Sequence, residues 1–390
     1  MNKSNSIYIH IPYCVSKCKY CDFFSVENHK TFVPQEYVEA LCNEIKYRKK
    51  QFNVSVLKTV YIGGGTPSLL TETQLSEICN VLFEGIVLSS DFEFTVEVNP
   101  DDVSEQLLLM FEKNKINRIS CGIQSLNDEC LRFSGRRASL KENLKALEIF
   151  RKFWKKDLSL DLICGLPGET EESFLEGLKK ICSYSPSHIS MYSLTIEENT
   201  VFGKLWEKGE LHYDFDKADE LWLKGRKFLM ESEYTHYEVS NFCKTGKECR
   251  HNLVYWNHQD YIGIGSGGTG TVYFDNGTGY RWTNVNNLTE YINFWKNSIF
   301  LDDLPQAGEK IDLDTSKFEF FMMGLRKISG ISEKQYEELF GEKIPEKIKD
   351  CFCKWQKYDR AEITKNEEDT VFTLGKDGIL FLNAFLEEII

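Results

Sequence analysis

Apolar residues follow two periodicities along the first half of the chain. Short, nearly continuous apolar runs predict strands, at residues 6–11, 57–62, 92–98, 117–122, 158–163 and 188–194. Between these runs, apolar residues recur at helical spacing and predict helices, at residues 36–52, 71–83, 104–113, 139–153 and 171–184. About six strand-helix units in alternation predict a parallel sheet covered by helices. We favour an incomplete TIM-type (β/α)6 barrel over an open doubly wound sheet.

The second half of the chain loses this regular alternation. Charge and proline signals predict a linker at 301–310. Helical or extended patterns occur at residues 215–231, 234–242, 315–327, 332–340, 345–356, 361–363 and 371–374, before a last helix. The final three helices and two short strands predict a small winged-helix-like α+β domain. The expected division is a barrel domain at 1–235, a connecting segment at 236–304 and a C-terminal domain at 305–390.

The charge of the chain argues against a nucleic-acid partner. Its 390 residues are 42% apolar and 27% charged, as in an ordinary globular protein, but the formal net charge is −13. A surface that binds phosphates needs the opposite balance. Winged-helix domains are associated with DNA, yet this one is rich in acidic residues, namely Glu337, Glu338, Glu367, Glu368 and Asp369. We therefore expect the C-terminal domain to serve as an interaction module or a lid.

No secretory or membrane-spanning segment is expected. Residues 1–11 lack the apolar core of a signal peptide, and no run of about 18 apolar residues occurs. Thirteen cysteines, an odd number, are scattered along the chain, which disfavours a disulfide framework and fits a reducing compartment. The sequence predicts a cytoplasmic protein and leaves peripheral contact with a membrane open.

Three cysteines near the N-terminus form a distinctive cluster. Cys14, Cys18 and Cys21 are separated by three and then two residues, soon after the first predicted strand and Pro12. Because iron-sulfur clusters usually have four thiolate ligands, three close cysteines predict a cluster with one iron free to bind a small molecule. A zinc site and chance clustering are the alternatives, although a zinc ribbon would need a second cysteine pair at matching spacing.

Polar residues and glycines gather where the other predicted strands end, which is where barrels of this kind carry their chemistry. The glycines at 63–65 permit close approach of the backbone to a ligand, but they would also suit a tight turn. Isolated polar side chains at strand ends are often only solvated, but here several converge on one rim, namely Glu97, Asn99, Gln124 and Asp161. A second glycine-rich run, at 263–270, lacks the Lys-Ser/Thr ending of a phosphate loop.

Several ordered motifs together resemble one family. They are Tyr8-Ile9-His10-Ile11-Pro12-Tyr13-Cys14 through Cys21, Gly63-Gly64-Gly65-Thr66-Pro67, Glu97-Val98-Asn99-Pro100, Gly122-Ile123-Gln124-Ser125, Gly135-Arg136, Asp161-Leu162-Ile163, Gly165-Leu166-Pro167-Gly168 and Ser193-Leu194-Thr195. Over nearly the whole chain they resemble the radical SAM superfamily, in its coproporphyrinogen III oxidase-like branch. The resemblance implies that Cys14, Cys18 and Cys21 hold a [4Fe-4S] cluster whose fourth iron binds S-adenosylmethionine (SAM) through its amino and carboxylate groups.

The same resemblance assigns further residues to SAM. They are Tyr8 near the cluster and sulfonium, Gly64, Gly65 and Thr66 at the methionyl amino group, Arg136 at the carboxylate, Glu97, Gln124 and Asp161 at the sulfonium side and ribose hydroxyls, and Thr195 at the adenine side. In the catalytic members of the family, one electron from the cluster cleaves SAM to methionine and a 5'-deoxyadenosyl radical, which abstracts hydrogen from the substrate.

Two kinds of protein in this branch differ around the cluster. The oxygen-independent oxidases carry an N-terminal extension and a fourth cysteine two residues after the third, whereas this chain has Phe23 there and thirteen residues before Cys14. It also has Arg250-His251-Asn252-x-x-Tyr255-Trp256, which resembles the signature of the heme chaperones of the branch. The resemblance thus implies transfer of heme to an unidentified acceptor protein, with an electron donor needed if SAM is cleaved. Radical oxidative decarboxylation of coproporphyrinogen III is the alternative, so whether the chain is an enzyme stays open.

The signature contains candidate heme contacts. Histidine is a common axial ligand of heme iron, so His251 could bind the iron, and Tyr255 and Trp256 could flank the flat macrocycle. The other interpretation is that His251 caps a turn and that the aromatic rings belong to the core. His10 and His236 are further ligand candidates, and we expect His10 to lie nearer the cluster.

The chain departs from the family pattern in its second glycine-rich run. Family members usually have Pro-Gly-Ala-His after the second glycine of the Gly-Ile-Gly segment, whereas residues 266–269 here are Ser-Gly-Gly-Thr. Thr269 cannot ligate iron as an imidazole would. If that pocket touches heme or the adenine end of SAM, affinity or specificity is expected to differ in this protein.

Overall fold

The strands of the barrel follow one another in sequence order across a single sheet. The computed structural model describes residues 5–28, 32–297, 304 and 306–389. The order in the sheet is β11-β1-β4-β5-β6-β7-β8-β10-β9, parallel from β11 to β8 and antiparallel beyond it. The strands are β1 (Ser6–Ile11), β4 (Val56–Gly64), β5 (Val87–Val98), β6 (Arg118–Gln124), β7 (Asp157–Cys164), β8 (His188–Ser193), β9 (Thr235–Glu238), β10 (Asn241–Cys243) and β11 (Ile262–Ile264). The predicted incomplete barrel is confirmed.

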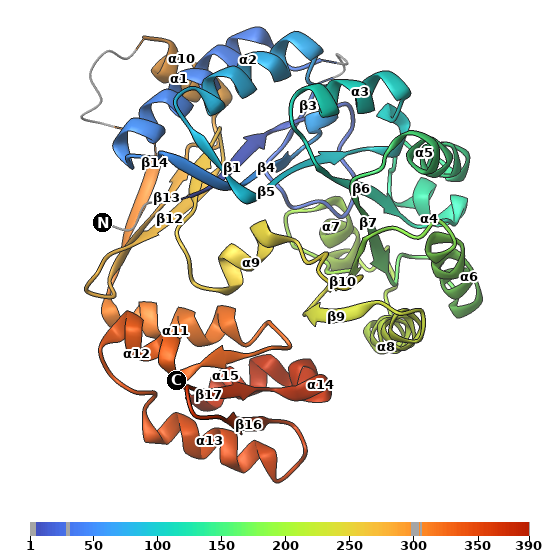
Figure 1. Ribbon diagram of the computed structural model, residues 1–390. Coiled ribbons are helices and arrows are strands. Elements are labelled where there is room, and N and C mark those ends of the chain that lie inside the picture. The colour runs from blue at the N-terminus through green and yellow to red at the C-terminus, as the bar shows by residue number, and fades with distance from the viewer. Residues whose placement is uncertain (1–4, 29–31, 298–303, 305, 390) are drawn as a thin grey trace.

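Helices cover the outer face of this sheet (Figure 1). They are α1 (Gln35–Gln51), α2 (Glu72–Phe83), α3 (Glu105–Lys113), α4 (Asp128–Phe133), α5 (Leu140–Phe153), α6 (Glu171–Cys182) and α8 (Phe215–Glu231), with short 3-10 turns η1 (Pro67–Leu69) and η2 (Pro100–Asp102). A further helix, α7 (Val201–Glu207), packs against the cysteine loop, where the Phe202 N–H donates to Lys19 O at 2.9 Å. The capping box predicted from Thr71 and Gln74 forms at the start of α2. Such caps satisfy backbone N–H groups that have no partner inside a helix, so α2 begins at a defined residue.

Burial on both faces explains why the strands could be read from the sequence. In β1, Ile7, Ile9 and Ile11 are fully buried, and Ile9 pairs in register with Ile62 of β4. Strands of a parallel sheet are covered by helices on one side and by the barrel interior on the other, which selects continuous apolar runs. Because β1 and β4 to β8 run parallel to one another, their carboxyl ends lie at one rim of the barrel.

The connecting segment differs from its prediction. The strand expected at 234–242 is a hairpin of β9 and β10, and both strands extend the barrel sheet. The expected linker at 301–310 lies partly outside the described residues, and its remainder contributes to a strand, β14 (Gln306–Ile311). β14 joins β12 (Thr269–Tyr273) and β13 (Gly279–Asn284) in an antiparallel sheet, and α10 (Leu288–Asn297) packs against α1. The chain therefore stays folded onto the barrel through most of this region.

The C-terminal domain has the predicted helices and strands around its own core, which includes Phe320, Tyr336, Phe352 and Phe385. Its elements are α11 (Leu313–Gly324), β15 (Ile331–Ser332), α12 (Glu333–Phe340), α13 (Glu346–Gln356), β16 (Glu362–Lys365), β17 (Thr370–Thr373), α14 (Gly375–Gly378), η3 (Ile379–Phe381) and α15 (Leu382–Ile389). β15 adds a third strand to the two expected. A short helix, α9 (Arg250–Trp256), lies between this domain and the barrel (Figure 1).

Within the described parts of the chain, no helix combines the length and the apolar character needed to cross a membrane.

Candidate cofactor cavity

A cavity of about 450 Å³ opens at the carboxyl ends of the parallel strands. This volume lies within the range of small-molecule sites in proteins. Its walls include Cys14, Cys18, Cys21, Phe23, Gly64, Gly65, Thr66, Glu97, Asn99, Gln124, Arg136, Asp161 and Thr195. The structure therefore brings together the three cysteines and eight of the nine residues expected around SAM; the ninth, Tyr8, does not line the cavity. Sequence reasoning missed several other lining residues, among them Ser120, Ile163, Tyr192 and Leu194.

The cysteine loop is held in place by backbone hydrogen bonds. The N–H of Lys19 donates to Ser134 O at 3.0 Å, and the N–H of Cys21 donates to Cys18 O at 3.2 Å. All three thiols are free, with Cys14 buried and the other two half-buried. Burial raises the pKa of Cys14 and raises that of Cys21 to about 11. Since metals and clusters bind thiolates, loading this loop must release protons.

The glycines after β4 are required by packing against β1. Gly64 has φ +111°, and a Cβ atom there would lie 2.4 Å from the His10 ring. A Cβ on Gly65 would lie 2.7 Å from Tyr13 O, and the Gly65 N–H donates to Ile11 O at 2.9 Å. These contacts account for the glycines as a tight turn. The same turn places backbone on the cavity wall, so both interpretations of the glycine run apply.

Three polar side chains join the cysteine loop to the neighbouring strand ends. Thr66 Oγ1 donates to Cys14 Sγ at 3.6 Å, and Asn99 Nδ2 donates to Thr66 Oγ1 at 3.2 Å. Arg136 donates through Nη2 to Asn99 Oδ1 at 3.0 Å and through Nη1 to Cys18 Sγ at 3.5 Å. Its buried Nε has no hydrogen-bond partner among the described residues. A guanidinium with an unused donor on a cavity wall is suited to an anionic group such as a carboxylate.

Two half-buried carboxylates also line the cavity. Glu97 Oε1 accepts a hydrogen bond from Tyr61 Oη at 2.8 Å, and burial together with the nearby charge of Asp161 raises the pKa of Glu97 to about 7. Asp161 accepts from Ser120 Oγ at 2.6 Å and from Ser159 Oγ at 3.0 Å, and burial raises its pKa as well. A cationic ligand beside either carboxylate would favour its ionised form, and a ligand hydroxyl could donate a hydrogen bond to it.

Gln124 reaches the cavity because β6 is irregular at its end. The register with β7 shifts between Gly122 and Gln124, and Gln124 has φ +63°. A bulge of this kind re-aims a side chain at the end of a strand. Tyr8 lies apart from the lining: its hydroxyl forms a 2.9 Å hydrogen bond with His10 Nδ1, and its ring stacks on Tyr61 at 6.1 Å.

His251 is buried at the start of α9 and does not line the cavity. Its Nδ1 forms a 2.8 Å hydrogen bond with Thr59 Oγ1, and its Nε2 forms a 2.8 Å hydrogen bond with Tyr255 Oη. Burial lowers the pKa of His251 to about 3, so the ring is neutral. Trp256 faces the C-terminal domain, with the guanidinium of Arg326 5.3 Å from its ring. In this conformation both ring nitrogens of His251 are already engaged in hydrogen bonds, with Thr59 and Tyr255.

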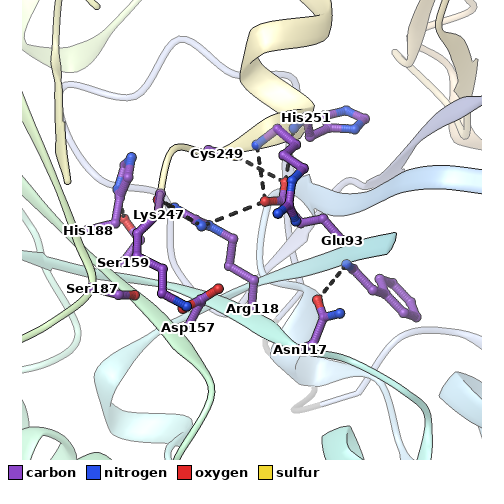
Figure 2. Close-up of polar contacts among 12 residues, drawn as sticks. Glu93, Asn117, Arg118, Asp157, Ser159, Ser187, His188, Lys247, Cys249 and His251 are labelled. Atoms are coloured by element: carbon purple, nitrogen blue, oxygen red, sulfur yellow. Dashed lines mark hydrogen bonds and ion pairs between the residues drawn. The ribbon is translucent and has the colours of Figure 1, made fainter. Parts of the chain in front are cut away.

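A buried ion pair holds the segment that leads into α9 (Figure 2). Glu93 accepts hydrogen bonds from the His251 N–H at 2.9 Å and from Cys249 Sγ at 3.5 Å. Arg118 lies 3.6 Å from Glu93 and donates through both terminal nitrogens to Lys247 O, at 3.2 and 3.1 Å. Sequence reasoning did not find this network, because its members are distant in sequence and only His251 belongs to a motif.

The two further histidine candidates are also packed. The Nε2 of His10 forms a 2.8 Å hydrogen bond with Phe24 O, in addition to its bond with Tyr8. His236 is buried with its ring stacked on Phe242 at 4.5 Å. Neither histidine lines the cavity.

The second glycine-rich run supports the fold beside the cavity. The Gly265 N–H donates to the buried Glu44 carboxylate at 2.8 Å, which ties this run to α1. Thr269 forms a 2.9 Å hydrogen bond with Thr283 across the strand pair β12 and β13. Neither residue lines the cavity.

Comparisons with known proteins identify the family. The model of the radical SAM superfamily matches residues 8–181. A protein named heme chaperone HemW from Buchnera aphidicola subsp. Schizaphis graminum is 34% identical, covering 98% of this chain and 97% of the relative. Another protein of that name, from Bacillus subtilis, is 35% identical and covers 98% of this chain and 100% of the relative. The chain belongs to the HemW family.

HemW-family membership agrees with the architecture. The structure of coproporphyrinogen III oxidase (HemN) from Escherichia coli matches with a TM-score of 0.79 and 20% identity, over 99% of this chain and 90% of HemN. That likeness concerns the fold alone. Membership of the radical SAM superfamily implies a [4Fe-4S] cluster and SAM, which favours the iron-sulfur interpretation of the three cysteines over zinc. The free thiols, the cavity volume and the unused Nε of Arg136 fit this pair of cofactors.

Proposed function

We propose that this protein is a cytoplasmic heme chaperone, which binds heme and passes it to an acceptor protein. The observation that carries the proposal is the identity of about one third, over essentially the full length, with relatives named heme chaperone HemW. Phe23 gives further support, because it stands where the oxygen-independent oxidases carry a fourth cysteine. Its side chain is 70% exposed at the cavity wall.

Within this proposal, Cys14, Cys18 and Cys21 hold the [4Fe-4S] cluster. Arg136 binds the SAM carboxylate through its free donor, and the backbone at Gly64 to Thr66 binds the amino group. Glu97, Gln124 and Asp161 serve the sulfonium side and the ribose, and Thr195 lies at the adenine side; these residues share the cavity wall. When bound, a reduced cluster can supply one electron to SAM, and an electron donor is then required.

Heme ligation by His251 requires a change from the described conformation. One ring nitrogen must leave Thr59 or Tyr255 before it can bind iron. We propose that Nε2 is the ligating atom, because its partner Tyr255 lies on the same helix and is half-buried. Tyr255 and Trp256 would then be free to contact the macrocycle.

Heme titration of three proteins tests this assignment. We expect His251→Ala to lower heme affinity at least tenfold and to remove the absorption spectrum of a histidine-bound heme. Tyr255→Phe removes the hydroxyl that holds Nε2, so this variant should keep that spectrum and bind heme at least as tightly as wild type. Unchanged binding by His251→Ala would exclude this ligand. A wild-type protein without stoichiometric heme binding would exclude the chaperone function.

The alternative is an oxygen-independent coproporphyrinogen III oxidase, favoured by the match of fold to HemN over almost the whole chain. The two functions predict different products. Anaerobic, reduced, cluster-loaded protein given SAM and coproporphyrinogen III should form no protoporphyrinogen if it is a chaperone. Clear decarboxylation under these conditions would replace the chaperone proposal with the oxidase.

A further inference from the structure

A chain of hydrogen bonds crosses the barrel interior from the start of α9 to the cavity. The Cys249 N–H donates to Tyr237 Oη at 3.2 Å, and Tyr237 Oη lies 2.9 Å from His188 Nε2. His188 Nδ1 lies 2.8 Å from Ser159 Oγ, which donates to Asp161 Oδ1 at 3.0 Å. Asp161 lines the cavity, and Cys249 is the residue immediately before α9. Figure 2 shows Ser159 and His188 on one side of Arg118, and Cys249 and His251 on the other.

The carboxylate end of this series of bonds fixes the direction of the others. An ionised carboxylate can only accept a hydrogen bond, so Ser159 gives its single proton to Asp161 and must accept from His188 Nδ1. Burial, together with the charge of Arg118, lowers the pKa of His188 well below its usual range, so the ring is neutral and its one proton lies on Nδ1. The unprotonated Nε2 then accepts from Tyr237 Oη, which itself accepts from the Cys249 N–H.

Among the described residues, Ser190 is a competing acceptor beside this path. Its Oγ lies 3.4 Å from Ser159 Oγ. It is neutral and farther away than the Asp161 carboxylate, and hydrogen bonds to ionised groups are roughly twice as strong as bonds between neutral groups. The Ser159 proton accordingly points to Asp161. Ser159 and Ser120 donate to different oxygens of Asp161, and Ser190 is a third serine that hydrogen-bonds to this carboxylate.

We propose that His188 and Tyr237 are positioning residues for SAM, acting through Ser159 on Asp161, and that they link SAM binding to the position of the α9 segment. This inference rests on the proposed placement of the SAM ribose at Asp161. If the segment at Cys249 moves away, the Tyr237 hydroxyl loses the N–H donor that holds it in place beside His188 Nε2. By linkage, SAM bound at Asp161 must favour the described position of α9 by the same factor.

The first test reads the protons directly and needs no cofactor. Imidazole 15N chemical shifts distinguish the two neutral forms of histidine, and the His188 signals can be assigned by their loss in a His188→Gln variant. We expect His188 to be protonated on Nδ1 alone. A ring protonated on Nε2, or one that exchanges between both forms, would overturn the proposed direction of the chain.

The second test compares two tyrosines from the same region. Tyr237→Phe removes the hydroxyl at the centre of the hydrogen-bond path. Tyr234 is a similarly buried tyrosine whose hydroxyl donates to Pro186 O at 2.8 Å and takes no part in that path, so Tyr234→Phe is the control. In cluster-loaded protein under anaerobic conditions, we expect SAM to bind Tyr237→Phe about tenfold more weakly than wild type. Tyr234→Phe should stay within twofold of wild type. Equal affinities of both variants would refute the positioning role.

A double mutant separates a connected chain from independent losses. We expect the double variant Ser159→Ala with Tyr237→Phe to weaken SAM binding no more than the more damaging of the two single changes, because each change breaks the same path. Multiplied losses would contradict a single path. Failure of wild-type protein to bind SAM would remove the proposed SAM site itself, and the 15N measurement on wild type would still decide the direction of the hydrogen bonds.

Discussion

Two regions of the barrel interior contain the same kinds of charged group in different surroundings. At the cavity, Arg136 and Glu97 are half-buried on the wall, Arg136 Nε has no partner among the described residues, and burial raises the pKa of Glu97 to about 7. Near α9, Glu93 and Arg118 are almost fully buried, and each is surrounded by backbone and side-chain partners. The half-buried position on a cavity wall, more than the charge itself, distinguishes the cofactor site from the scaffold.

The largest expected effect concerns the cysteine loop. We expect Cys14→Ser to abolish the [4Fe-4S] cluster, because two remaining protein thiolates and an alcohol cannot replace three thiolates. Iron and sulfide content, with the visible absorption of the reconstituted protein, measure this. Cys353→Ser is the matched control, since Cys353 is exposed on the C-terminal domain. A Cys14 variant with a full cluster would show that the loop is not the site.

A large loss of stability is expected when the buried ion pair of Glu93 and Arg118 is broken. Glu93→Gln leaves the Arg118 guanidinium buried without its counter-charge, which should lower the free energy of unfolding by about 3 to 5 kcal/mol. Glu309→Gln is the control, because it breaks an exposed ion pair with Arg281 and should cost about 1 kcal/mol or less. Denaturant unfolding of the two variants measures the difference. Equal losses would show that the Glu93 pair contributes no more than a surface pair.

A smaller effect is expected from the protonation of Glu97. A cationic ligand such as SAM favours the carboxylate, so its affinity should rise about tenfold between pH 6 and pH 8 as a group with a pKa near 7 loses its proton. Glu97→Gln should bind with little dependence on pH. Ligand-free stability should change in the opposite direction: the folded pKa lies above the unfolded value, so this contribution is complete below about pH 4.5 and is lost as the pH rises through 7. A flat affinity profile for wild type would exclude Glu97 from the ligand contact.

The barrel was predictable because its strands are buried on both faces. The strand predicted at 57–62 is part of β4 (Val56–Gly64), and the helix predicted at 171–184 contains α6 (Glu171–Cys182). β14 gave no such signal, since four of its six residues are exposed and polar or small. The turn between β9 and β10 is so short that residues 234–242 gave the pattern of a single strand. The pattern of apolar residues therefore predicts buried strands and helices better than it predicts exposed strands at the edge of a sheet.

The cavity was predictable from strand ends, whereas the surroundings of α9 were not. Topology places the ends of parallel strands at one rim, so Glu97, Gln124 and Asp161 could be grouped before the structure was known. The path through His188 and Tyr237 depends on side chains from strands that are distant in sequence. No spacing rule connects them, and only the folded arrangement shows which atoms meet.

The smallest effect is expected at Thr269, where the chain departs from its family. The Thr269 hydroxyl bonds to Thr283 across β12 and β13, and the residue lies outside the cavity lining. Thr269→Val keeps the shape of the side chain and removes only this hydroxyl, so it should lower the free energy of unfolding by about 0.2 to 1 kcal/mol. SAM and heme affinities should remain within twofold of wild type. A larger change in either affinity would place Thr269 in a binding site and would extend the functional region beyond the rim formed by the strand ends.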